Sequence, residues 1–114
     1  MKLLGAVLRA CLFATLANCA TRDEVEAWKR EFPIVGVGTS FELRQLASSY
    51  EMEVMQTTSA NIYPTIRRLR ERAERDVAEA SRLSKSGKGP SARAGKEKQD
   101  WLTNQLLPFL RKMG

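Results

Sequence analysis

The sequence predicts an all-α protein, either a small three- to four-helix bundle or a helical hairpin with a docked C-terminal helix. Three observations support this fold class. Apolar residues recur three and four positions apart over most of residues 23–113. The β-branched run Ile34–Gly38 holds two glycines and is expected to be an extended connector, not a central strand. The residues from Cys19 to Gly114 are enough for one domain, which we place at 19–114.

The first eighteen residues have the order of a secretory signal peptide. Lys2 and Arg9 are the only charged residues before Arg22, and the run Ala10–Ala17 is apolar except for one threonine. The apolar run is too short to cross a bilayer, which takes about 20 residues. We therefore expect residues 1–18 to be a leader that is removed.

The end of this leader resembles the processing box of bacterial lipoprotein precursors. Leu16, Ala17 and Cys19 match that box, while Asn18 stands where the class usually has Gly, Ala or Ser. The resemblance implies that Cys19 becomes the lipid-modified first residue of the mature chain. It also implies the periplasmic face of the outer membrane, because Ala20 is not the Asp that favours inner-membrane retention.

Other interpretations of this segment stay open. An ordinary signal peptidase cleaving after Ala17 or Cys19 would give a secreted or soluble periplasmic protein. A mitochondrial transit peptide fits the absence of acidic residues before Asp23. Cys11 and Cys19 are also compatible with a buried helix. Lipidation best explains why an exported domain has no cysteine after residue 19 with which to form a stabilising disulfide.

Two helices are expected in the acidic half of the chain. The first covers residues 23–32 and ends at Pro33. Its apolar face is Val25, Trp28 and Phe32. The second begins with a capping box in which Thr39 is the N-cap and Glu42 reaches back to it. Its apolar stripe is Leu43, Leu46, Ala47, Tyr50 and Val54, flanked by Met52 and Met55.

A third helix is expected after a break at residues 57–61, with Pro64 in its first turn. It runs to Ser84 with the apolar stripe Ile62, Ile66, Leu69, Ala73, Val77, Ala80 and Leu83. Oppositely charged residues stand four apart along it, which indicates a solvated outer face. The pairs are Arg67–Glu71, Arg70–Glu74, Glu71–Arg75, Arg72–Asp76 and Arg75–Glu79.

Residues 85–96 hold three Gly, one Pro and no large apolar side chain, and we expect a flexible basic loop there. The last segment is a dense apolar helix interrupted by Pro108. Four of its residues, which are either core or a groove-binding surface for a protein partner, are Trp101, Leu106, Phe109 and Leu110.

The composition argues against an enzyme. The chain has no histidine, which excludes Ser-His, Cys-His and histidine-metal sites. One cysteine in the mature chain is too few for a thiolate metal site. Gly36-Val37-Gly38 lacks the Lys-Ser/Thr that follows in a phosphate-binding loop. We therefore predict no catalytic residue, no metal and no cofactor.

The charge distribution indicates a partner instead. Residues 19–66 carry four basic and seven acidic residues, whereas residues 67–114 carry thirteen basic and six acidic residues. The candidates for an anionic partner are Arg67, Arg68, Arg70 and Arg72. A nucleic-acid site in residues 67–98 is the alternative. It is the less favoured one, because acidic residues are interleaved with the arginines.

Together these observations favour an exported, lipid-anchored helical binding protein. We expect a protein partner in the cell envelope and a role as an accessory or assembly factor, for example of a secretion or conjugation apparatus. The alternative function is a basic helical nucleic-acid-binding protein.

Overall fold

A computed structural model describes residues 20–113 and confirms the all-helical fold class, with no strand among those residues. Residues 1–19, including the expected leader and Cys19, lie outside the described part. The elements are α2 (Arg22–Arg30), α3 (Phe41–Met55), α4 (Ile62–Ser86), α5 (Pro90–Trp101), η1 (Leu102–Leu106) and α6 (Leu107–Arg111). Because α5, η1 and α6 follow one another without a loop, the described chain forms a four-helix bundle.

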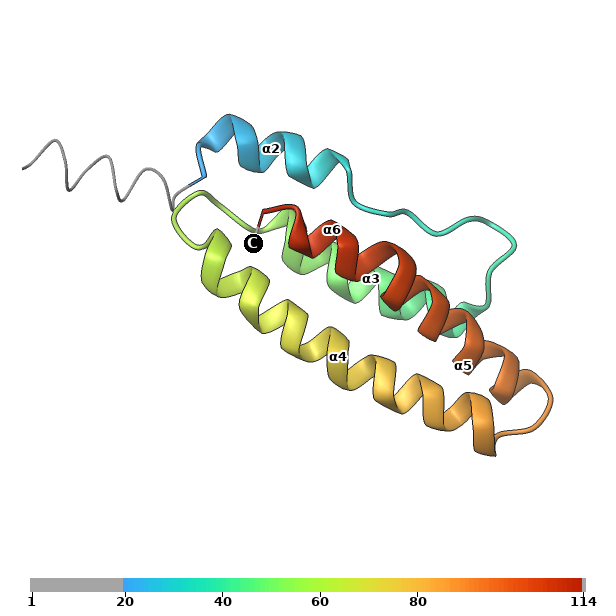
Figure 1. Cartoon of the computed structure of the whole chain (residues 1–114). Helices are drawn as coiled ribbons and strands as arrows, with labels where there is room; N and C mark the ends of the chain where they lie inside the picture. Colours follow the sequence, from blue (N-terminus) through green and yellow to red (C-terminus); the bar gives the residue numbers. More distant parts are fainter. Residues whose placement is uncertain (1–19, 114) are drawn as a thin grey trace, which may run out of the picture.

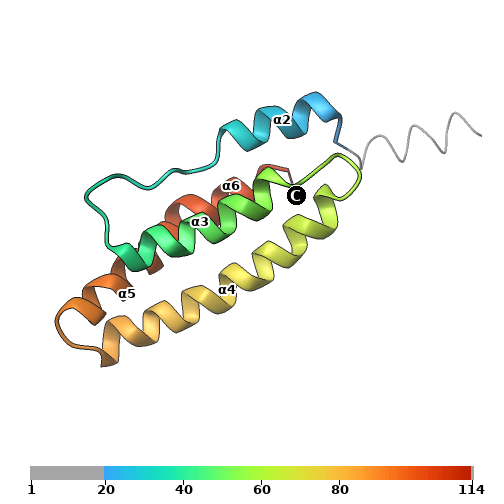
Figure 2. The same cartoon turned by 180° about the vertical axis from the view of Figure 1, so that it is seen from behind.

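The four helices lie roughly along one direction (Figure 1). The helix formed by α5, η1 and α6 packs against α4 and α3, and α2 lies over its C-terminal half. Seen from behind, α3 lies in front of α6, between α2 and α4 (Figure 2). We call the end with the start of α2, the loop 56–61 and the end of α6 the proximal end, and the end with residues 36–40 and the turn 87–89 the distal end.

The first helix, α2, begins with a capping box formed by Thr21 and Glu24, which was not predicted from the sequence. The Glu24 backbone N–H donates to Thr21 Oγ1 (3.1 Å), and the Thr21 N–H donates to Glu24 Oε1 (3.0 Å). The hydrogen bond from the Thr21 backbone holds the pKa of Glu24 below its usual value. The predicted box of Thr39 and Glu42 is wrong, because Ser40 is the N-cap of α3 and accepts from the Leu43 N–H (3.2 Å).

Thr39 has a different role in the connector between α2 and α3. Its hydroxyl donates to the Gly36 carbonyl (2.8 Å), which closes a turn just before the helix. The connector is extended before that turn, as predicted. The predicted break before α4 is confirmed as well, and Pro64 is the third residue of α4, where its missing N–H breaks no helical hydrogen bond.

The expected flexible loop 85–96 is mostly helical. Only Gly87–Gly89 separate α4 from α5, and Pro90 is the first residue of α5. Gly89 has a φ of 59°, which allows the reversal of chain direction. The loop prediction is wrong because the small residues of this segment serve helix packing, not flexibility.

Gly95 shows this packing most directly. A Cβ on Gly95 would lie 2.8 Å from the Ser84 nitrogen and 2.9 Å from the Ala80 oxygen, both in the backbone of α4. Ala80 and Ala94 are buried beside this contact. The α4 and α5 backbones therefore approach each other as closely as a glycine allows.

Pro108 does not end the C-terminal helix. The turn before it widens into a π-helix, in which the Leu107 N–H donates to the Leu102 carbonyl five residues back. Proline lacks an N–H and clashes with the carbonyl four residues earlier, and one wide turn relieves both problems. The apolar faces of α5 and α6 can thus lie on the same core.

Candidate interaction surface

The aromatic and aliphatic residues proposed as a partner-binding surface lie in the core. Trp101 and Phe109 are each 3% exposed, and Leu106 and Leu110 are fully buried. Of the two roles that the sequence left open for these four side chains, the structure shows the core role. The folded chain uses them to hold α2 and the connector on the C-terminal helix.

Two tryptophans make that attachment. Trp28 stacks on Phe109 with ring centroids 4.5 Å apart, and its Nε1–H donates to the Phe109 carbonyl (2.9 Å). Trp101 Nε1–H donates to the Pro33 carbonyl (3.2 Å). Phe32 contacts both Trp101 and Phe109 edge-on. Each indole thus buries its ring and still satisfies its one donor.

The arginines proposed to bind an anionic partner divide into two kinds. Arg68 and Arg72 both donate to the Glu53 carboxylate on α3, Arg72 at 3.0 Å. Arg72 also donates to Ser49 Oγ (2.7 Å) and lies 4.2 Å above the Tyr50 ring. These contacts make Arg72 an internal bridge between α3 and α4. Its guanidinium group is used within the fold, so the expectation that Arg72 binds an anionic partner is corrected.

Arg67 and Arg70 remain on the outer surface of α4. With Glu71 and Glu74 they line a shallow depression of about 240 Å³. Two carboxylates beside two guanidinium groups leave little net charge for an anion. Of the five predicted ion pairs within α4, the described structure has Arg72 with Asp76 (3.7 Å). Arg68 and Arg72 also reach across to Glu53 on α3.

Tyr50 completes the polar bridge between α3 and α4. Its ring is fully buried, and its hydroxyl donates to Asp76 Oδ2 (2.5 Å). Burial, followed by the hydrogen bond and the charge of Asp76, raises the pKa of Tyr50 well above its usual value of 10.0. The phenol therefore acts as a neutral donor that fixes the register of the two helices, not as an acid or base.

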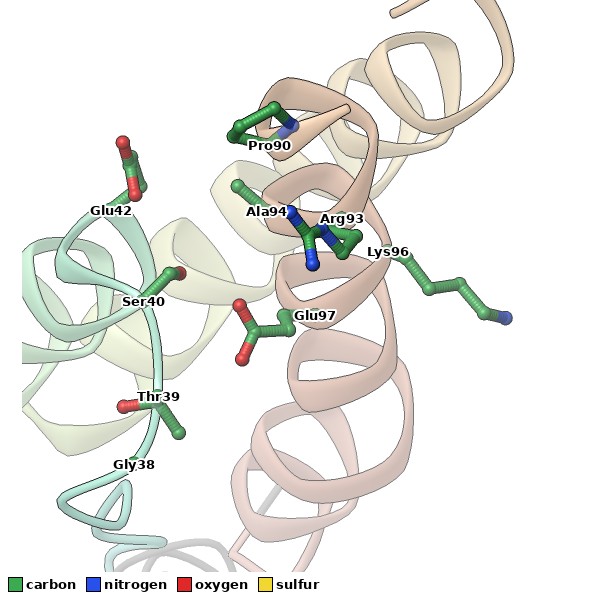
Figure 3. A pocket seen from close by; sticks show the side chains of 9 residues that line it. All are labelled: Gly38, Thr39, Ser40, Glu42, Pro90, Arg93, Ala94, Lys96 and Glu97. Carbon is green, nitrogen blue, oxygen red and sulfur yellow. The ribbon is translucent and has the colours of Figure 1, made fainter. Parts of the chain in front are cut away.

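An open cleft lies at the distal end, between the end of the connector and α5 (Figure 3). It has a volume of about 530 Å³ and is open to solvent. Glu97 points across it toward Ser40 and Thr39, whereas Lys96 points away. The lining residues are Gly38, Thr39, Ser40, Glu42, Pro90, Arg93, Ala94, Lys96 and Glu97. Such a mixed, open lining suits contact with another protein better than capture of one small anion.

Large apolar side chains stand in solvent beside this cleft and along α3. Val37 is 94% exposed and Ile34 79% exposed, both on the connector. Phe41, Met52 and Met55 on α3 are 61%, 62% and 44% exposed. In the sequence the two methionines stand out only as neighbours of the buried stripe. The outward position of Phe41 was readable from its place opposite that stripe.

Among residues 20–113 no group of three or more possible ligands (His, Cys, Asp or Glu) is placed to hold a metal ion. Within the same range no helix combines the length and apolar character needed to span a bilayer. Comparison of the chain with protein-family models, with curated proteins and with solved structures gives no match.

Proposed function

We propose that the chain is an exported, lipid-anchored binding protein on the periplasmic face of the outer membrane. In this role it is an accessory or assembly factor of a cell-envelope complex such as a secretion or conjugation apparatus. The observation that carries the proposal is the leader that ends in the lipoprotein-type box at Cys19, directly before a cysteine-free helical body.

The way the body begins supports an anchor at this position. Ala20 is buried, Thr21 caps the first helix, and α2 starts at Arg22. No flexible linker therefore separates a lipidated Cys19 from the folded body. An acylated Cys19 would hold the proximal end of the bundle against the bilayer, and more than one acyl chain makes such attachment stable.

The same geometry directs the distal end away from the membrane. The 25 residues of α4 run between the two ends, which corresponds to about 37 Å. At the distal end lie the open cleft and the exposed Val37. We infer that a protein partner is met there, at a distance from the lipid surface.

Mass spectrometry of the membrane-extracted protein tests the anchor. We expect a mature chain whose first residue is a lipid-modified Cys19. Cys19→Ser should abolish both the lipid and the processing, while Cys11→Ser, inside the leader, is the matched control and should change neither. A chain that retains Met1, or that begins with an unmodified residue, would refute the proposal.

Binding to nucleic acid is the competing function and has its own test. The exposed Arg67 and the Lys85, Lys88 and Arg93 of the distal end are the cations that such binding would use. It predicts a gel shift at low salt that weakens steeply as salt is added. It also predicts loss of the shift when Arg67, Arg68 and Arg70 are replaced by Ala. No shift at low salt would exclude this function.

A further inference from the structure

The outer face of α3 carries an apolar stripe that no other part of residues 20–113 covers. Phe41, Ser48, Met52 and Met55 are separated by seven, four and three residues, so all four lie on one side of the helix. The buried residues of α3, among them Ala47 and Tyr50, lie on the opposite side. The stripe is thus a second, exposed apolar face on α3, the helix seen between α2 and α4 in Figure 2.

We propose that this stripe binds the same stripe of a second copy of the chain, with the two α3 helices antiparallel and a twofold axis at Ser48. A twofold axis brings residues at equal distances on either side of Ser48 opposite each other. Phe41 lies seven residues before Ser48 and Met55 lies seven residues after it. Each Phe41 would therefore meet Met55 of the second copy.

The surface around Met55 has the shape to receive that ring. Met55 lines a hollow of about 440 Å³ with Glu26, Lys29 and Arg30 of α2. Lys29 Nζ is fixed there by a hydrogen bond to the Met55 carbonyl (3.1 Å). A protruding aromatic ring at one end of the stripe thus matches a hollow with basic side chains at the other end. Contact between Phe41 and these cations adds to the apolar contact.

Charges along the stripe select a second copy over other occupants. Arg44 and Glu51 are seven residues apart and lie on the same flank of the stripe. In a twofold antiparallel pair the equivalent flanks of both helices lie on the same side. Arg44 lies four residues before Ser48 and Glu51 three residues after it, so their heights along the helix differ by about 1.5 Å and Arg44 is within reach of Glu51 of the second copy. Both oppositely charged pairs form at once, and such complementarity fixes register. Ser48 at the centre is small enough for close approach.

The acidic character of this half of the chain disfavours a lipid surface as the occupant. Residues 20–61 carry four basic and seven acidic residues, and anionic lipids repel such a face. The surface area that one pair of 15-residue helices can bury is small compared with the roughly 1,200–2,000 Å² buried in a stable interface. We therefore expect a weak dimer that forms at high local concentration.

Charge reversal separates a second copy from any other occupant. Arg44→Glu alone places two glutamates opposite each other at each charged pair, and Glu51→Arg alone places two arginines there. Neither variant should pair with itself. An equal mixture of the two, or the double variant, restores oppositely charged pairs and should dimerise again.

Thiol cross-linking in the full chain provides the readout. Cys11→Ser and Cys19→Ser leave an introduced Ser48→Cys as the only thiol, and a short bismaleimide traps the dimer. We expect cross-linking to fall on the order of tenfold in each single charge variant and to return in their mixture. Ser91→Cys on α5 controls for random collision, and Arg67→Glu on α4 controls for the change in net charge.

Each other outcome overturns the proposal. No Ser48→Cys dimer at high protein concentration would show that the stripe does not bind itself. Dimers unaffected by the charge variants would show that association occurs elsewhere, for example through residues 1–19. Loss in the single variants without recovery in the mixture would show that Arg44 and Glu51 do not face each other, which would refute the proposed twofold pairing.

Discussion

Trp28 makes two contacts with one residue, stacking its ring on Phe109 with planes 7° apart while its indole N–H donates to the Phe109 carbonyl. This double contact joins the first described helix to the last across 81 positions of the sequence. The residues on either side of Pro108 must therefore be placed correctly before α2 can dock.

Replacement of Trp28 should separate the contribution of ring packing to stability from that of the indole hydrogen bond. Trp28→Ala leaves a large cavity and should lower the free energy of unfolding by about 3–5 kcal/mol. Trp28→Phe keeps a ring but removes the donor, and we expect a loss of about 1–3 kcal/mol. Urea unfolding followed by circular dichroism measures both. Equal effects of the two variants would show that the hydrogen bond, not the ring volume, dominates.

Gly95→Ala should destabilise the protein although alanine is the better helix former. In an isolated helix, replacing Gly with Ala raises the stability of the helix by at most about 1 kcal/mol. Here the new methyl group meets the α4 backbone at 2.8–2.9 Å, so we expect a loss of about 1–3 kcal/mol. Ser91→Ala, on the exposed side of α5, is the control and should stay within about 0.5 kcal/mol. A stabilised Gly95→Ala protein would contradict the close helix contact.

Arg72→Lys should be more harmful than the same change at Arg67. Arg72 bonds Glu53 and Ser49 at once and stacks on Tyr50, which a lysine ammonium cannot reproduce. We expect a loss of about 1–2 kcal/mol, within the range for hydrogen bonds to charged groups. Arg67→Lys should be close to neutral. Thermal unfolding of the two variants side by side measures the difference.

Stability should fall at alkaline pH through Tyr50. Its pKa is raised in the folded state, so the unfolded chain loses the phenol proton first as the pH passes about 10. The stabilisation that buried, protonated Tyr50 contributes to the fold is complete below that pH and is lost progressively above it. Tyr50→Phe should flatten this alkaline decline. Tyrosinate absorbance should show that Tyr50 keeps its proton until the fold is lost; titration of Tyr50 near pH 10 in the native state would show that the buried hydrogen bond is absent.

The parts that sequence could predict are those set by local periodicity. The buried faces of α3 and α4 follow directly from apolar residues at helical spacing, as Leu43, Tyr50, Ile66 and Leu69 show. The extended connector and the break before α4 follow from Gly and Pro placement. All of these depend on residues within one or two turns of each other.

The parts that sequence could not predict depend on contacts between distant segments. The segment from Pro90 to Gly95 has the composition of a loop, and only its approach to Ala80 shows why small residues are needed. The arginines of α4 fit pairs within their own helix, whereas the fold offers Glu53 as a partner on α3. Trp101 and Leu106 were compatible with both core and partner surface, because an apolar face alone does not say what covers it.

The attachment of α2 also determines how the protein would respond to mechanical load. Tension arriving from the N-terminal side enters the fold at Ala20 and passes along a nine-residue helix to Trp28 and Phe32. These side chains, with the hydrogen bonds of Trp28 and Lys29 and the ion pair between Glu31 and Lys112, are what resists it, and they can be peeled away one after another. The first element would thus detach at low force and lengthen the tether by the extended connector, while the three remaining helices absorb none of the strain.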